Sequence, residues 1–210
     1  MARGTTREIV LEAAPILFAE RGYGPTSVRQ VAEVAGTTPR VLFHHFGTKE
    51  GLLNALAQPL VDELDEALAT PAFPDADLDR ATLVRTYVAL LLRRRDVARV
   101  LLVDDSARTA PAGVALAERQ RRLAARLVGP RGNLERQVRA RCALAVAQLA
   151  VGDLKTVPAF RLRLPLTEAA VDALVGAPGR TIDLTDIGGV SVRLQDELDT
   201  AREVVATHDR

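Results

Sequence analysis

The chain has 210 residues, 48% of them hydrophobic, and a formal net charge of +1. This length can bury a real hydrophobic core and allows one large or two small domains, of which we favour two. The near-neutral charge excludes a global basic field that would attract nucleic acid, so any such binding must come from the local placement of basic side chains. Because no uncharged apolar run reaches about 18 residues, no membrane span and no membrane partner are expected.

Long alanine- and leucine-rich stretches favour helix throughout, so the expected fold class is all-α. A cytoplasmic location is expected, because the N-terminus lacks the charged-then-apolar layout of a signal peptide. The single cysteine, Cys142, cannot form an internal disulfide, which agrees with a reducing compartment.

The first expected helix begins at Thr5 or Thr6 and ends at Gly22. Pro15 lies inside this pattern. Since a proline in a helix loses one hydrogen bond and crowds the preceding turn, we expect a kink, or a displaced helix start near Ala14.

A second, short helix is predicted between Ser27 and Gly36. Its apolar residues recur at spacings of three and four, so one face can pack inward; they are Val28, Val31, Ala32 and Ala35. Thr26 or Ser27 would be the N-cap, and Ser27 with Gln30 has capping-box spacing. Gly36 would end the helix, because a tight turn needs left-handed backbone there.

A third helix follows directly, with Thr38 as N-cap and Pro39 in the first turn, where a missing N–H costs nothing. Its buried face is expected to contain Val41, Leu42, Phe43 and Phe46. Two short helices joined by a glycine turn form a helix-turn-helix, whose second helix enters the DNA major groove. The alternative is a plain helical hairpin with solvated outer residues. Arg40 is best suited to reading a base edge, because a guanidinium can pair with both guanine acceptors.

The run from about Thr5 to Leu53 resembles the N-terminal domain of the tetracycline-repressor (TetR) family of bacterial transcription regulators. The residues that carry this resemblance are IVLEAAPILFAERGYGPTSVRQVAEVAG, followed by LFHHFGTKEGLL. The resemblance covers roughly a quarter of the chain. It implies a DNA-binding domain of three helices at residues 1–47, and a helical ligand-binding and dimerisation domain at residues 48–210.

The resemblance also implies which side chains meet DNA. Thr26 or Ser27 would touch a phosphate at the start of the second helix, and Lys49 would hold a phosphate at the start of the fourth. The residues that would face the groove are Thr37, Thr38, Arg40, Val41, His44 and His45.

Three positions depart from the family's pattern. Phe43 stands where a phosphate-bonding tyrosine is usual, which weakens one backbone contact. Arg40 stands where glycine is common, and Val41 where threonine is common, and both changes would alter which bases are read.

Further helices are expected, in chain order, at residues 48–69, 78–95, 96–107 and 111–128. The pattern at 78–95 is apolar on nearly every side, which is typical of a central buried helix. If the second domain holds a small molecule, Tyr87 and Leu91 on this helix are the candidate pocket residues. The alternative for Tyr87 is a tyrosine that simply packs in the core.

A helix expected from Asn133 to about Val151 has two apolar stripes. One can face the core and the other a partner helix; the second stripe consists of Ala143, Val146, Ala147 and Ala150. In the TetR family two C-terminal helices of each subunit form a four-helix dimer interface, and this helix resembles the first of them. A loop at 153–165, a short helix at 167–175, irregular or briefly extended chain at 177–189 and a helix at 192–207 are expected to follow. Either of these last two helices could complete the interface, and the longer one is favoured.

No catalytic, metal-binding or cofactor site is predicted, and the chain is not expected to be an enzyme. The three histidines are His44, His45 and His208, and one cysteine cannot complete a thiolate set. Asp104 and Asp105 are neighbours on an expected helix and do not face each other, so they form a poor acid/base pair.

Eight arginines between positions 119 and 141 form a basic zone. The favoured interpretation is a set of solvated helix faces whose positive charge is balanced by the acidic stretch at 62–79. The alternative is a second nucleic-acid surface.

Two hypotheses for the function follow. The first is a homodimeric repressor of the TetR type that a small, mainly apolar effector releases from a double-stranded DNA operator. The second is a ligand-independent dimer that binds DNA or a partner.

Overall fold

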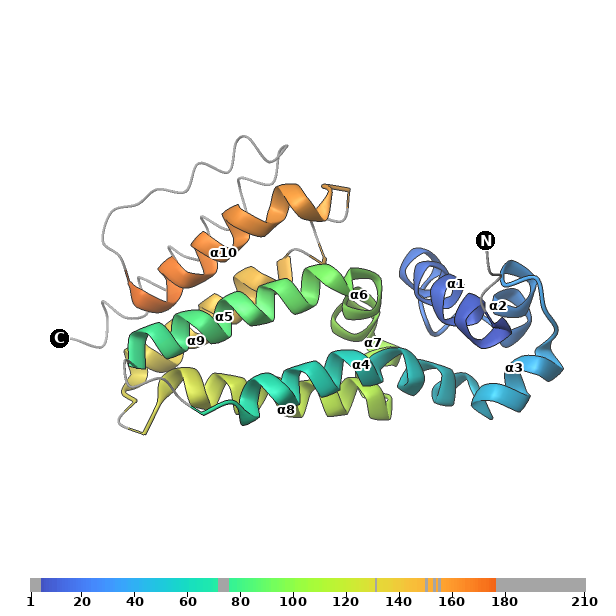
Figure 1. The fold of residues 1–210 in the computed structure, drawn as a ribbon, viewed down its shortest axis with the longest axis horizontal. Coiled ribbons are helices and arrows are strands. Elements are labelled where there is room, and N and C mark those ends of the chain that lie inside the picture. Colours follow the sequence, from blue (N-terminus) through green and yellow to red (C-terminus); the bar gives the residue numbers. More distant parts are fainter. Residues whose placement is uncertain are drawn as a thin grey trace. The chain divides into compact units, whose positions relative to one another are not determined.

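The computed structural model describes residues 5–71, 76–130, 132–149, 151–152, 154 and 156–176. Every helix or strand assigned within these ranges is an α-helix, which confirms the predicted fold class (Figure 1). In chain order the helices are α1 (Thr6–Arg21), α2 (Val28–Val34), α3 (Pro39–Phe46), α4 (Lys49–Ala69), α5 (Ala76–Arg93), α6 (Arg95–Val103), α7 (Asp105–Thr109), α8 (Pro111–Val128), α9 (Leu134–Leu149) and α10 (Ala159–Val175). None of these helices combines the length and the apolar character that crossing a bilayer requires.

The described chain divides into two compact units. The N-terminal unit comprises the chain up to Thr70 together with Leu90–Arg121. The C-terminal unit comprises Pro71–Ala89 together with the described residues from Arg122 onward. The long helices α5 and α8 each contribute residues to both units.

Helix α1 is the central element of the N-terminal unit and contacts α2, α3, α4 and α6. Its buried side chains include Val10, Leu17 and Phe18. The helix begins with a capping box between Thr5 and Glu8 and runs unbroken through Pro15, which is buried. The predicted alternative of a displaced start near Ala14 is therefore wrong, because a full capping box upstream supplies the helix start.

The single helix predicted at 96–107 is two helices in the structure. The chain breaks at Asp104, whose backbone is extended (φ −84°, ψ 119°) and whose carboxylate accepts a hydrogen bond from the backbone N–H of Ala107 at 3.0 Å. An aspartate that offers its side chain to a helix start competes with helix continuation. Asp104 therefore ends α6 and is the N-cap of α7.

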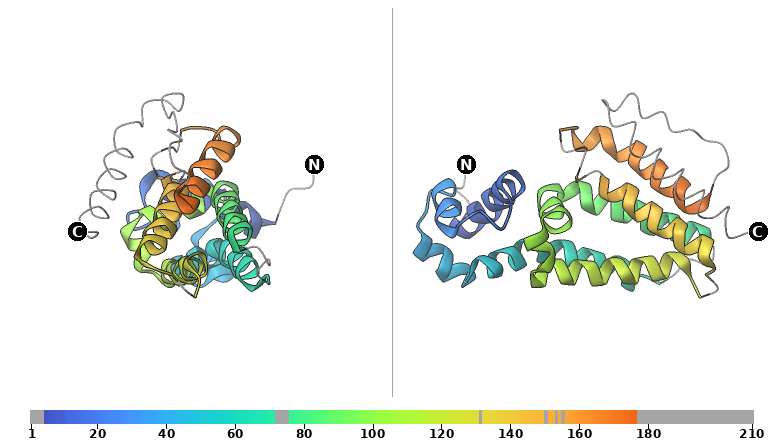
Figure 2. Two further views of the ribbon diagram at one scale, coloured as in Figure 1. Left: turned by 90° about the vertical axis from the view of Figure 1, so that its left-hand side faces the viewer. Right: turned by 180° about the vertical axis from the view of Figure 1, so that it is seen from behind.

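Helices α9 and α10 form a hairpin in the C-terminal unit (Figures 1 and 2). The prediction of a loop at 153–165 followed by a helix at 167–175 is wrong, since α10 begins at Ala159 and continues through Pro165. Leu162 and Leu166, one turn apart, are both buried. Burial of this apolar face outweighs the hydrogen bond that the proline loses.

The second stripe of α9 is part of the core of this unit. Ala143 and Ala147 are 0% exposed and Val146 is 7% exposed within the single chain. The prediction that this stripe meets a partner helix is therefore wrong for these residues. Ala150 and the predicted elements at 177–189 and 192–207 lie outside the described residues.

Candidate nucleic-acid interface

The turn between α2 and α3 is built by backbone hydrogen bonds that end α2. The N–H of Thr37 donates to the carbonyl of Ala32 at 2.8 Å, and the N–H of Gly36 donates to the carbonyl of Glu33 at 3.1 Å. This pair of bonds is the Schellman arrangement, which requires left-handed backbone at the residue just before Thr37. Gly36 supplies that conformation with φ +62°. The predicted role of Gly36 is confirmed.

The start of α2 is held by the capping box predicted from its sequence. The N–H of Gln30 donates to the Ser27 hydroxyl at 3.2 Å, and the Gln30 side chain accepts from the N–H of Ser27 at 2.8 Å. Thr26, the alternative N-cap, is 1% exposed, and its hydroxyl donates to the carbonyl of Gly22 at 2.7 Å. Of the two hydroxyls considered for a phosphate contact, only that of Ser27 is therefore exposed.

Helix α3 presents most of the predicted groove-facing residues to solvent. Its buried anchor is Leu42, which is 3% exposed. The residues Thr38, Arg40, His44 and His45 are exposed, and Thr37 and Val41 are half-buried. Phe43, expected on the buried face, is 51% exposed, so that part of the prediction is wrong. The reason is its place next to Leu42: neighbouring residues on a helix point about 100° apart, and Leu42 takes the inward direction.

A sharp connection joins α3 to α4. Gly51 lies so close to the end of α3 that an added Cβ would stand 2.0 Å from the carbonyl oxygen of Phe46, which only glycine avoids. Thr48 caps α4 by accepting from the N–H of Gly51 at 2.8 Å. These contacts set the first turn of α4, and with it Lys49, next to the exposed face of the motif.

Lys49 makes two contacts within the chain. Its ammonium donates to the carbonyl of Gly24 at 3.0 Å and lies 4.3 Å from the centre of the Tyr23 ring. Partial burial lowers the pKa of Lys49 from its ordinary value, and the nearby Asp104 carboxylate opposes that change. Burial, followed by the charges of Glu50 and Asp104, raises the pKa of the Tyr23 phenol. Since an ammonium has three donors, these contacts leave Lys49 able to hold a phosphate as well.

Asp104 joins the α6–α7 break to this motif, and sequence reasoning missed it. Its carboxylate accepts from the backbone N–H of Tyr23 at 2.8 Å while also capping α7. The available signal was an aspartate directly before a short polar helical segment, which is a typical N-cap pattern. The long-range bond to Tyr23, 81 positions away, has no signal in a single sequence.

The candidate effector residues lie on α5 and are deeply buried. Tyr87 is 1% exposed and its hydroxyl accepts from the side-chain amide of Gln148 at 3.4 Å, within the C-terminal unit. Leu91 is 0% exposed in the N-terminal unit. Most apolar residues of α5 between Leu83 and Leu92 are buried, as expected for this helix, while the role of Tyr87 and Leu91 in ligand binding stays a prediction. In the part of the chain that the structure describes, no three His, Cys, Asp or Glu residues gather as a metal site.

The sequence of the helix-turn-helix region matches known regulators. Residues 10–56 match the family model of "bacterial regulatory proteins, tetR family". The chain is 40% identical over 58 residues to the HTH-type transcriptional repressor KstR2 of Rhodococcus jostii, and 45% identical over 53 residues to the repressor AcnR of Corynebacterium glutamicum. Each alignment covers 28% of the relative and 28% or 25% of this chain, so the matched part is about a quarter of each protein.

Solved structures match over most of the chain. The Streptomyces coelicolor TetR-family member SCO3833 covers 86% of this chain with a TM-score of 0.66 and 22% identity; 96% of its own chain is covered. Mycobacterium smegmatis AmtR covers 89% of this chain with a TM-score of 0.64 and 25% identity; 92% of its own chain is covered. The relatives matched in sequence are named transcriptional repressors rather than enzymes, as the sequence predicts. The glycine turn, the exposed face of α3 and the two kinds of similarity agree: residues 10–56 match the tetR family of bacterial regulatory proteins, and the chain shares the fold of a solved TetR-family structure.

Proposed function

We propose that this protein is a DNA-binding transcriptional repressor that uses α3 as its recognition helix. The observation that carries the proposal is the exposed face of α3, which includes Arg40, His44 and His45. This helix follows a glycine turn that is fixed by backbone hydrogen bonds at the end of α2. The relatives that match this region are named transcriptional repressors. Bacterial operators lie in the cytoplasm, which is where such a protein would act.

The DNA-contacting residues proposed for this function are those that the family resemblance implies, without the buried Thr26. Ser27 and Lys49 would hold phosphates, while Arg40 would read a base edge together with its neighbours on the same face. The proposed neighbours are Thr37, Thr38, Val41, His44 and His45. We place the division between the DNA-binding domain and the remainder after residue 47.

A homodimer is part of the proposal, because one helix-turn-helix reads only a few base pairs and operators of this kind present two half-sites. The interface we propose includes the outer face of α10. Phe160 is 81% exposed and Leu164, one turn later, is 66% exposed. Large apolar side chains exposed together mark protein interaction sites, and a two-fold axis would pair this face with itself.

Release by an effector is the regulatory part of the proposal. A small, mainly apolar molecule would bind in the helical domain near Tyr87 and Leu91 of α5. The rival hypothesis is a dimer that binds DNA or a partner without any ligand. A thermal-shift screen of apolar compounds distinguishes them, because a ligand that binds the native state raises the unfolding temperature.

The decisive experiment for DNA binding is selection from a random duplex library with the full chain, followed by footprinting of the enriched sequences. The expected result is a two-fold-symmetric site whose half-sites lie one helical turn, or a multiple of it, apart. A reporter controlled by that site should be repressed when the protein is produced. Failure to enrich any sequence over the starting library would refute the proposal.

A further inference from the structure

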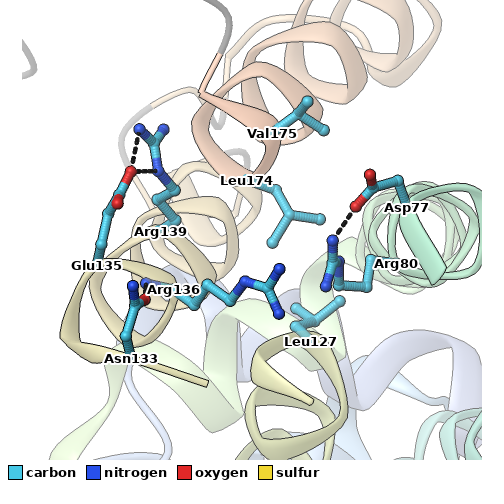
Figure 3. A pocket seen from close by; sticks show the side chains of 9 residues that line it. All are labelled: Asp77, Arg80, Leu127, Asn133, Glu135, Arg136, Arg139, Leu174 and Val175. Atoms are coloured by element: carbon cyan, nitrogen blue, oxygen red, sulfur yellow. Dashed lines mark hydrogen bonds and ion pairs between the residues drawn. The ribbon is translucent and has the colours of Figure 1, made fainter. Parts of the chain in front are cut away.

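A cavity of about 380 Å³ lies in the C-terminal unit, at the end of the α9–α10 hairpin where α9 begins and α10 ends (Figure 3). This volume falls within the range of small-molecule sites, about 300–1,000 Å³. Side chains from α5, α8, α9 and α10 line it. The polar ones are Asp77, Arg80, Asn133, Glu135, Arg136 and Arg139. We call it the arginine cavity.

Two of the three arginines already have partners. Arg80 forms an ion pair with Asp77, and Arg139 forms one with Glu135 at 2.7 Å. Arg139 also lies against Gly176, where an added Cβ would stand 1.9 Å from its Nη1. These two arginines are therefore held in place by the fold.

Arg136 is different. Figure 3 shows its side chain extending across the cavity between Leu127 and Leu174. Among the residues that the structure describes, its guanidinium has no hydrogen-bond or ion-pair partner. Three guanidinium groups and two carboxylates line the cavity, so one positive charge is in excess there.

The place of Arg136 on its helix adds to this imbalance. Asn133 caps α9 by accepting from the N–H of Arg136 at 3.0 Å, so Arg136 lies in the first turn. A cation in the first turn of a helix is opposed by the helix dipole, and an anion bound there relieves the repulsion. Other arginines of the basic zone have acidic partners, as expected: Arg119 pairs with Asp65, and Arg126 with Asp79.

We propose that the arginine cavity is a binding site for a small organic monocarboxylate with an apolar body. The carboxylate would accept two hydrogen bonds from the planar fork of Arg136. The apolar body would contact Leu127, Leu174 and Val175, which line the same cavity. A dianion such as phosphate is disfavoured, because Asp77 and Glu135 also line the cavity and would repel the second charge.

This site is distinct from the effector position proposed at Tyr87 and Leu91, neither of which lines the arginine cavity. Its test therefore needs no DNA. Titration calorimetry of the full chain with hexanoate as the probe should show saturable binding to one site. Hexanamide, which has the same shape but no charge, should not bind measurably over the same range.

The variant that tests the assignment is Arg136→Gln, with Arg141→Gln as the matched control. Arg141 is exposed on the same helix and does not line the cavity. Loss of Arg136 should weaken hexanoate binding about tenfold or more, because a hydrogen bond between charged groups contributes at least about that factor to affinity. Arg141→Gln should bind as the unchanged protein does. The exposed Arg136 side chain predicts equal unfolding temperatures for both variants without hexanoate.

Three results would overturn the proposal. The first is no saturable binding of hexanoate by the unchanged protein, and the second is equal binding by Arg136→Gln. The third is displacement of hexanoate by inorganic phosphate or by a random DNA duplex at lower concentration than by octanoate, which would make the basic zone a phosphate or nucleic-acid surface. These binding measurements do not depend on an operator, so they would remain valid even if the DNA selection experiment failed.

Discussion

Arg40 presents a charged, planar group on the exposed face of α3, and its loss should change sequence discrimination. A bidentate contact to guanine is worth about 1–3 kcal/mol of discrimination against other bases. Arg40→Ala should lower affinity for the selected site by that amount and leave binding to random duplex nearly unchanged. Fluorescence anisotropy with both duplexes measures the difference, and Arg85→Ala on the exposed surface of α5 is the control. Equal weakening on both duplexes would mean that Arg40 contacts phosphate.

Lys49 should act on every DNA sequence alike. Its ammonium lies at the start of α4, where the helix dipole opposes a cation, and a phosphate would relieve that repulsion. Lys49→Ala should weaken binding to selected and random duplexes equally and reduce the slope of log affinity against log salt by about one. Lys49→Arg, which keeps the charge, should retain most of the slope. If the slope does not change in Lys49→Ala, the contacts to Gly24 and Tyr23 are the whole role of this residue.

Asp104 should matter for stability, because one carboxylate serves two backbone N–H groups, those of Tyr23 and Ala107. Removing it leaves both partly buried donors without their acceptor. Asp104→Ala should reduce the free energy of unfolding by about 1–3 kcal/mol, measured by urea denaturation. The side chain of the neighbouring Asp105 is exposed and pairs with Arg108, so Asp105→Ala should change stability by less than about 0.5 kcal/mol. Similar losses in both variants would contradict this account.

At the scale of the elements, the small residues of α9 have the opposite role to the one their pattern predicts. Ala147 is 0% exposed in the single chain, so a large charged side chain there has neither room nor a partner. Ala147→Arg should destabilise the fold by about 3–5 kcal/mol, as an uncompensated buried charge does. Ala145→Arg, exposed on the same helix, should be nearly neutral. Urea denaturation of both variants tests this predicted loss of stability. A stable, monomeric Ala147→Arg protein would instead mean that this stripe forms a subunit interface.

At the scale of the whole molecule, DNA recognition depends on the number of recognition helices. The double change Phe160→Glu with Leu164→Glu places charges on the exposed apolar face of α10 and should yield folded monomer, because neither side chain is buried within the chain. Affinity for the selected site should fall strongly, since the second half-site is lost. Sedimentation velocity and anisotropy are the measurements.

The control for that variant is Val114→Glu, which changes an apolar side chain on α8 that is 52% exposed. It should remain dimeric if α10 carries the interface. A dimeric Phe160→Glu and Leu164→Glu protein with undiminished affinity would place the interface on another surface.

Features determined by a few neighbouring residues follow from the sequence alone. The Ser27 capping box, the Gly36 turn and the all-helical fold belong to this group, since caps, turn conformation and apolar periodicity act within one or two helical turns. For the same reason the helix-turn-helix and most of its exposed face could be predicted.

Features determined by residues distant in the chain needed the tertiary structure. Thr26 and Ser27 are equivalent as local caps, and only the folded structure shows that Thr26 is buried, with its hydroxyl bonded to the carbonyl of Gly22. Periodicity shows that α9 has two apolar stripes, yet only the folded structure shows that Ala147 lies inside the chain. The bond from Tyr23 to Asp104 spans 81 positions. A helix pattern states which residues share a face, whereas the partner of that face depends on the whole fold.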